Sequence, residues 1–111
     1  MRILQSPAVL PPLESDPRFA LALHHLEAHD WLEASDLFEE LFFEAVRDEL
    51  PLVRFLLQIS TGMHHIARGQ RRAAAQRLEE GMRVMGDVTN ARGVDLDAWR
   101  TFVERELAAL R

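Results

Sequence analysis

The stretch PLVRFLLQISTGMHHIARG, residues 51–69, decides the fold class. Its first residue is a proline, which suits the first turn of a helix because the missing N–H has no partner there. Its last residue is a glycine, which can adopt the left-handed conformation that ends a helix. Between them, apolar residues lie on nearly every side of a helical wheel, with Phe55 and Ile59 in one row and Val53 and Leu57 beside it. A helix of this kind is usually central and buried, so we expect one over residues 52–68.

Similar signals divide the rest of the chain into helices. Asp16 and Pro17 form a helix start, with a capping oxygen followed by proline, and this first helix should reach about residue 29. A second helix is expected over residues 31–47 and a fourth up to about residue 85. After a turn over residues 86–95, a fifth helix presents one apolar face, consisting of Leu96, Trp99, Phe102, Val103, Leu107 and Leu110. Since no segment alternates as a strand does, we predict an all-α, single-domain helical bundle of about five helices.

The first 15 residues differ from the rest. They contain Pro7, Pro11 and Pro12, which remove backbone donors and favour extended geometry in their neighbours. We therefore expect residues 1–15 to form an extended, proline-containing arm and residues 16–111 to form the domain. The arm is too apolar for a free tail, and we expect it to lie along the domain or a partner.

The chain resembles itself when it is shifted by 40 residues. LHHLEAHDWLEASDLFEEL, which starts at residue 23, then lies over MHHIARGQRRAAAQRLEEG, which starts at residue 63, and both histidines of each copy coincide. Periods of roughly 30–50 residues with helix–turn–helix content are typical of helical-hairpin repeats such as the tetratricopeptide type. The repeat predicts two such hairpins, in which the doubled histidines serve packing rather than a doubled active site.

The composition excludes several classes of function. There is no cysteine and all 13 basic residues are arginine, so thiol chemistry, Schiff bases and a phosphate-binding lysine loop are excluded. The net charge of −5 argues against general nucleic-acid binding, because clustered positive charge supplies most of that affinity. With no long apolar run for a membrane span or a signal peptide, we expect a cytoplasmic protein that does not act in a membrane.

Polar side chains on the second and third expected helices form a candidate pocket. Helix periodicity places Gln58, His65 and Arg68 in one row, and the preceding helix carries Ser35, Asp36 and Glu39. If these two rows face each other, the six side chains line a polar pocket. Within it, Asp36, Glu39 and His65 are the candidates for holding a divalent metal ion.

Other interpretations of the same residues stay open. Acids at this spacing also form a solvated helix face, and the arginines near residues 68–77 either bind an anion or pair with the surplus acids. His25 and His29 are a second candidate metal pair. Ser60 and His64 are one turn apart, but a serine–histidine pair without an acid is a weak sign of a nucleophile.

Residues from about 18 to 85 resemble the uncharacterised prokaryotic helical family catalogued as domain of unknown function 309. That family's first hairpin reads roughly A-H-E-x-x-E-x-x-W, a later helix carries glutamine and histidine, and R-G-N-x-x-G-A follows. The matching residues in this chain are Trp31, Ala34, Asp36, Glu39, Gln58, His65, Arg68, Gly69, Gln70 and Ala74. The departures are Ser35 for histidine, Asp36 for glutamate, Phe42 for tryptophan, Gln70 for asparagine and Ala73 for glycine.

The resemblance implies an all-α fold in which the acidic and histidine motifs converge, and it implies no activity. Ser35 in place of a histidine removes one strong metal ligand, which weakens an enzymatic interpretation. We therefore expect a non-catalytic helical binding or scaffolding module, with a protein partner or a second copy of the chain as its target. The alternative is a metal-assisted hydrolase or small-ligand-binding protein that uses the polar pocket between the second and third helices.

Overall fold

The computed structural model describes residues 12–111. A short 3₁₀ turn, η1 (Leu13–Ser15), precedes five helices: α1 (Pro17–Glu27), α2 (Trp31–Glu44), α3 (Leu50–Ala67), α4 (Arg71–Met85) and α5 (Leu96–Leu110). No strand occurs among residues 12–111, so the prediction of an all-α bundle with five helices is confirmed. None of the helices in this part of the chain has the length and apolar character needed to cross a bilayer.

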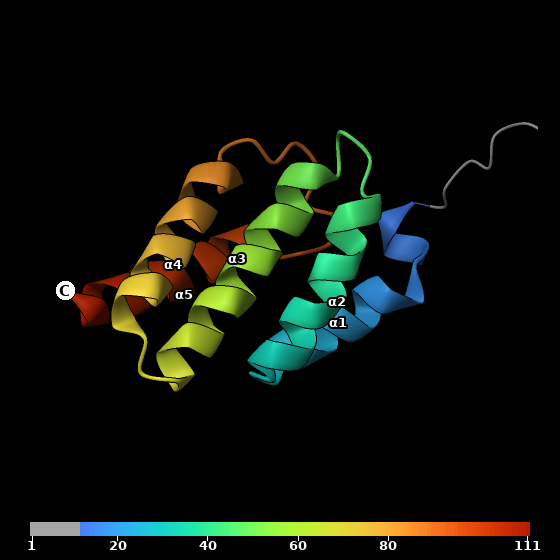
Figure 1. Ribbon diagram of the computed structural model, residues 1–111. Coiled ribbons are helices and arrows are strands. Elements are labelled where there is room, and N and C mark those ends of the chain that lie inside the picture. Colours follow the sequence, from blue (N-terminus) through green and yellow to red (C-terminus); the bar gives the residue numbers. More distant parts are fainter. Residues whose placement is uncertain (1–11) are drawn as a thin grey trace, which may run out of the picture.

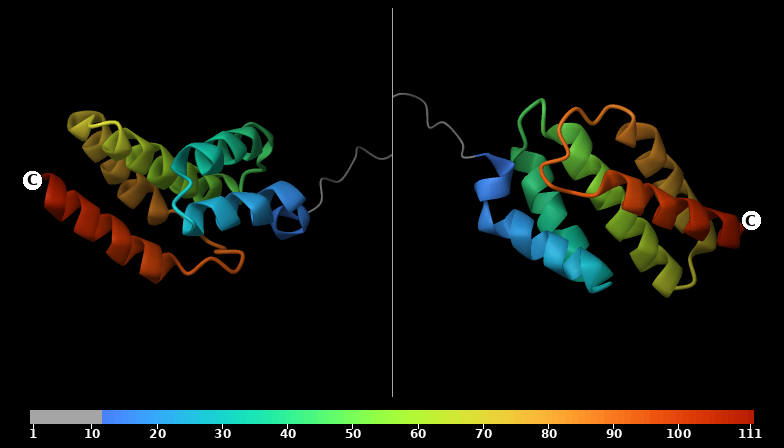
Figure 2. Two further views of the ribbon diagram at one scale, coloured as in Figure 1. Left: turned by 90° about the horizontal axis from the view of Figure 1, so that it is seen from below. Right: turned by 180° about the vertical axis from the view of Figure 1, so that it is seen from behind.

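The five helices form two antiparallel hairpins and a closing helix (Figure 1). α1 pairs with α2, α3 pairs with α4, and α3 lies between α2 and α4. α5 crosses behind α3 and α4, on the same side of the molecule as α1 (Figure 2). The backbone carbonyls of Ala109 and Leu110 accept hydrogen bonds from Arg71 at the start of α4, which fastens the end of α5 to the second hairpin.

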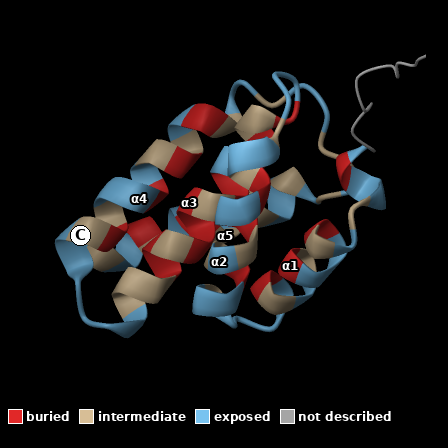
Figure 3. Ribbon diagram, turned by 45° about the vertical axis from the view of Figure 1, so that its right-hand side comes forward, coloured by how far each residue is buried: buried red, intermediate tan, exposed pale blue. Residues whose placement is uncertain are grey.

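α3 is the central helix, as the sequence predicts. Nine of its 18 residues are buried, more than in any other helix, and each of the other helices also carries buried residues (Figure 3). Two glycines let α3 and α4 approach closely. A Cβ atom added to Gly62 would lie 2.8 Å from Cδ2 of Leu78, and one added to Gly81 would lie 3.3 Å from Cβ of Gln58.

Two predicted helix ends were wrong. α1 ends at Glu27 rather than at residue 29, because His29 has a left-handed backbone with φ of 63°. α2 ends at Glu44 rather than at residue 47, because Ala45 is extended with ψ of 139°. Within the predicted arm, Leu13 begins a 3₁₀ turn and is buried. The prediction of an extended arm over residues 1–11 lies outside the described residues.

Candidate functional site

The three candidate residues on α2 lie towards solvent. Ser35 donates its hydroxyl hydrogen to the carbonyl oxygen of Leu32 in its own helix, at 2.9 Å. Asp36 and Glu39 are exposed, and no hydrogen bond or ion pair joins either carboxylate to another side chain within residues 12–111. These acids form an outward face of α2.

Gln58 on α3 faces α4 instead of the acids of α2. It is buried, and Nη1 of Arg77 lies 3.5 Å from its Oε1. Its neighbour one turn earlier in the polar row, Arg54, forms an ion pair with Glu80 of α4 at 2.8 Å. The expectation that Gln58 meets the acids of the preceding helix was wrong, because the polar row of α3 pairs with α4.

His65 closes the turn that joins α3 to α4. Its Nδ1 atom lies 2.6 Å from Oε1 of Gln70, and Arg68 is exposed at the end of α3. Among residues 12–111, no three histidine, aspartate or glutamate side chains come together in a group that could hold a metal ion. The described structure therefore does not assemble Asp36, Glu39 and His65 into a metal site.

The turn after α1 repeats the turn after α3. The amide of Asp30 donates to the carbonyl of His25 at 2.8 Å, and the amide of Gln70 donates to the carbonyl of His65 at 2.9 Å. The middle residue is left-handed in both turns, with φ of 63° at His29 and 75° at Gly69. The shift of 40 residues in the sequence thus corresponds to two copies of one interhelical turn.

The other histidine and serine candidates make contacts within the fold. Ser60 donates to the carbonyls of Leu56 and Leu57 in its own helix, so its hydroxyl is directed at the backbone rather than at His64. His29 stacks on Trp31, with 4.5 Å between the ring centroids. His25 lies 3.1 Å from a carboxylate oxygen of Asp30.

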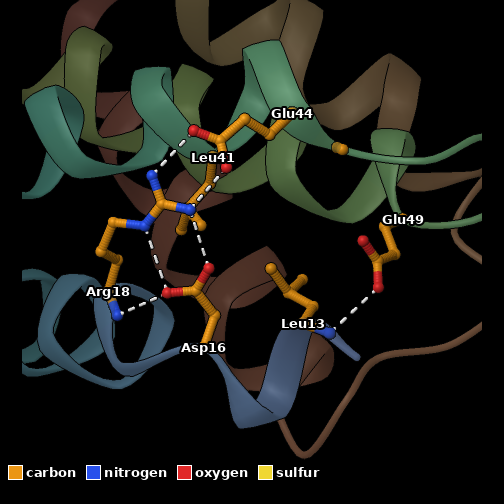
Figure 4. A pocket seen from close by; sticks show the side chains of 7 residues that line it. Leu13, Asp16, Arg18, Leu41, Glu44 and Glu49 are labelled. Carbon is orange, nitrogen blue, oxygen red and sulfur yellow. Dashed lines mark hydrogen bonds and ion pairs between the residues drawn. The ribbon is translucent and has the colours of Figure 1, made fainter. Parts of the chain in front are cut away.

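Arg18 organises a small cavity of about 40 Å³ at one end of the bundle (Figure 4). Its guanidinium bridges Asp16 at 2.8 Å and Glu44 at 2.6 Å, which joins α1 to the end of α2. Hydrogen bonding by Arg18 lowers the pKa of the Asp16 carboxyl and that of the Glu44 carboxyl below their ordinary values. The same carboxylates raise the pKa of Arg18. This set is a charge-paired junction between helices.

Arg92 is a second junction, which reasoning from the sequence missed. Its buried side chain reaches Glu14 at 2.7 Å and both Asp48 and Glu49 at 3.1 Å. Oε2 of Glu49 also accepts the amide hydrogen of Leu13. Hydrogen bonding to Glu14 contributes most to raising the pKa of Arg92. The loop between α4 and α5 is thereby fixed to η1 and to the connection between α2 and α3.

The outward face of α2 combines apolar and acidic side chains. Leu32, Asp36, Glu39 and Phe43 follow at i, i+4, i+7 and i+11, a spacing that aligns side chains along one side of a helix. Leu32 is 47% exposed and Phe43 is 80% exposed. We call these four residues the α2 face. Helix periodicity in the sequence could have identified this face, since its row lies opposite the buried Ala34, Phe38 and Leu41.

A sequence model of the family described as a domain of unknown function (DUF309) matches residues 19–77. This stretch is more than half of the 111-residue chain. The chain belongs to the DUF309 family. Searches of curated proteins and of solved structures gave no significant match.

The geometry gives the DUF309 motifs different roles. His65 of the second motif and Gly69 and Gln70 of the third build one interhelical turn through a side-chain contact, a left-handed glycine and a backbone hydrogen bond. In the first motif, Ala34 is buried against the core, whereas Asp36 and Glu39 are directed to solvent. The turn residues therefore shape the fold, and the acids of the first motif lie on the exposed side of α2.

Proposed function

We propose that this DUF309 protein is a non-catalytic binding module whose α2 face docks a basic, amphipathic helix of another protein. The observation that carries the proposal is the 80% exposure of Phe43 in the same row as two acids. Large aromatic side chains are typical anchors of protein interfaces. The same proposal places the protein in the cytoplasm, on the basis of its composition.

The dimensions of the α2 face fit a helix. Its first and last residues are 11 positions apart, or about 16 Å along the axis. An apolar side chain lies at each end and two acids lie between them, so a partner with the order apolar, basic, basic, apolar is complementary in either direction. A docked helix commonly uses anchors at i, i+3, i+4 and i+7.

The charge of the face favours a different protein over a second copy of the chain. An isologous contact would bring Asp36 and Glu39 of two copies towards each other, and like charges at an interface oppose association. Asp36 and Glu39 carry the negative charge of the face, because Glu40 and Glu44 on the same helix form ion pairs with Arg18. A partner with arginine or lysine in the middle of its apolar row meets the opposite charge.

The test is a titration with a labelled synthetic helix that carries leucine, arginine, arginine and leucine at the four complementary positions. Fluorescence anisotropy should show binding that weakens with added salt, because exposed charge pairs are screened. Phe43→Ser should weaken binding about tenfold, and the double change Asp36→Asn with Glu39→Gln should remove most of the salt dependence. Leu21→Ser is the control, since Leu21 is a leucine on α1 that is 47% exposed, as is Leu32 of the α2 face.

Two results would contradict the proposal. One is equal binding of a control peptide with glutamate in place of both arginines. The other is equal loss of binding in the Phe43→Ser and Leu21→Ser variants. Sedimentation of the protein alone completes the test, because a dimer that Phe43→Ser dissociates would assign the face to a second copy of the chain.

A further inference from the structure

A cavity of about 360 Å³ lies between α1 and the start of α5. This volume is within the range of about 300–1,000 Å³ that is typical of small-ligand sites. The cavity is separate from the α2 face, whose residues do not line it. Its lining residues are Leu23, Glu27, Gly93, Val94, Asp95, Ala98 and Trp99.

Two carboxylates and one indole ring determine the chemistry of this cavity. Neither Glu27 nor Asp95 forms an ion pair with any side chain of residues 12–111. Oδ1 of Asp95 accepts the amide hydrogen of Ala98 at 3.0 Å and so caps α5, which offsets the partial positive charge of that helix end. Trp99 is half-buried in the same lining, and the face of an indole attracts cations.

The wall of the cavity is held in place from outside. Gly93, which lines the cavity, has a left-handed backbone with φ of 84°. The preceding residue, Arg92, anchors this loop through its three carboxylate partners. Trp99 packs edge to face on Phe102, with 5.3 Å between the ring centroids. A cavity with a fixed wall loses less entropy when a ligand binds.

We propose that this cavity binds a cationic group on a short aliphatic stem, with a guanidinium as the preferred head. Glu27 and Asp95 neutralise the charge, Trp99 supplies a cation–π contact, and Leu23 and Val94 contact the stem. Glu27 and Asp95, neither of which has a cationic side-chain partner within residues 12–111, disfavour an anion. This inference goes beyond the α2 face, because it names a second site with its own ligand chemistry.

The experiment follows amide and indole resonances of the full chain by two-dimensional NMR during three titrations. N-acetylarginine amide represents an arginine side chain of a peptide, agmatine represents a free small molecule, and N-acetylcitrulline amide is the neutral analogue of the first. The two cations should shift the Trp99 indole signal and the amides of residues 93–98, whereas the citrulline compound should bind at least about fivefold more weakly. Agmatine carries an ammonium in addition to its guanidinium, so tighter binding of agmatine would point to a free small-molecule dication, and tighter binding of the arginine amide to a peptide.

Charge-removing variants locate the binding. Glu27→Gln and Asp95→Asn should each weaken binding of agmatine by about two- to fivefold, and asparagine keeps the helix cap of Asp95. Glu104→Gln is the control, because Glu104 is exposed on α5 and does not line the cavity. Cavity resonances that do not respond to either cation, equal affinity for the citrulline compound, or unchanged affinity in both cavity variants would each overturn the proposal. None of these results depends on Phe43 or on the α2 face.

Discussion

His25 and His65 close two copies of the same interhelical turn, since Nδ1 of His25 lies 3.1 Å from Oδ2 of Asp30 and Nδ1 of His65 lies 2.6 Å from Oε1 of Gln70. In each turn the partner of the histidine is the residue that precedes the next helix. The side-chain contact therefore spans the backbone reversal and fixes the point at which the second helix of the hairpin begins. This placement favours a structural role for both histidines.

The contact between His65 and Gln70 should stabilise the second hairpin. His65→Ala and Gln70→Ala are each expected to lower the free energy of unfolding by about 1 kcal/mol, the usual net value of one hydrogen bond. The double variant should cost less than the sum, with a coupling energy of about 0.5–1 kcal/mol from a double-mutant cycle. Urea denaturation measures all four proteins. Additive losses would show that the two side chains do not interact in solution.

Gly69 is required for its backbone conformation. Its φ is 75°, and a Cβ atom added there meets no neighbour within 4 Å, so any cost of a side chain comes from the left-handed backbone. Gly69→Ala should lower the free energy of unfolding by about 1 kcal/mol, and Gly69→Asn by less, because asparagine tolerates this conformation. Thermal unfolding of both variants checks the order. An alanine variant as stable as the parent protein would contradict it.

The side chain of Arg92 should stabilise the folded protein, whereas the left-handed backbone conformation of this residue should destabilise it. Arg92→Ala removes the guanidinium from the buried Glu49 and should cost about 3 kcal/mol. Arg92→Gly should cost about 1 kcal/mol less than Arg92→Ala, because φ is 51° at this position and glycine adopts it without strain. Urea denaturation gives both values. Equal losses in the two variants would argue against backbone strain at residue 92.

Acid should weaken the junction around Arg18. In the folded protein the pKa values of the Asp16 and Glu44 carboxyls lie below the ordinary 3.8 and 4.5, mainly because of hydrogen bonds from Arg18. The unfolded chain then binds protons more readily. The stabilisation is therefore complete above the ordinary pKa values and is lost as the pH falls through the lowered ones.

A variant without the arginine isolates this effect. Arg18→Gln should be less stable than the parent protein at neutral pH, and the difference should shrink as the pH falls below about 4. Arg105→Gln is the control, because Arg105 is exposed and forms no ion pair within residues 12–111. Urea denaturation across this pH range gives the curves. Parallel curves for Arg18→Gln and the parent protein would refute the assignment.

The helices could be predicted because their signals are local. Pro17 and Pro51 mark helix starts, Gly69 marks a helix end, and the apolar rows between them repeat with the helical period. The end of α2 was wrong by three residues because no glycine or proline marks Ala45, whose extended backbone starts the connection to α3. A helix end that no glycine or proline marks depends on how the next helix packs.

The candidate pocket could not be predicted in the same way. The helical period gives the row that contains Gln58 but not which neighbouring helix the row meets, and the close approach at Gly81 brings Gln58 to α4. The junction at Arg92 joins residues that are up to 78 positions apart, so no local sequence pattern predicts it. The pairing of His65 with Gln70 was accessible, because the 40-residue shift lays Gln70 over Asp30.

α5 belongs to both hairpins at once. Its Phe102 lies beside Trp31 and His29 of the first hairpin, while its last turn accepts hydrogen bonds from Arg71 of the second. If either hairpin unfolds, α5 therefore loses part of its packing, and the other hairpin loses contacts with α5. Heating should produce one calorimetric transition for residues 12–111, and a chain cut after residue 95 should instead melt broadly and at a lower temperature.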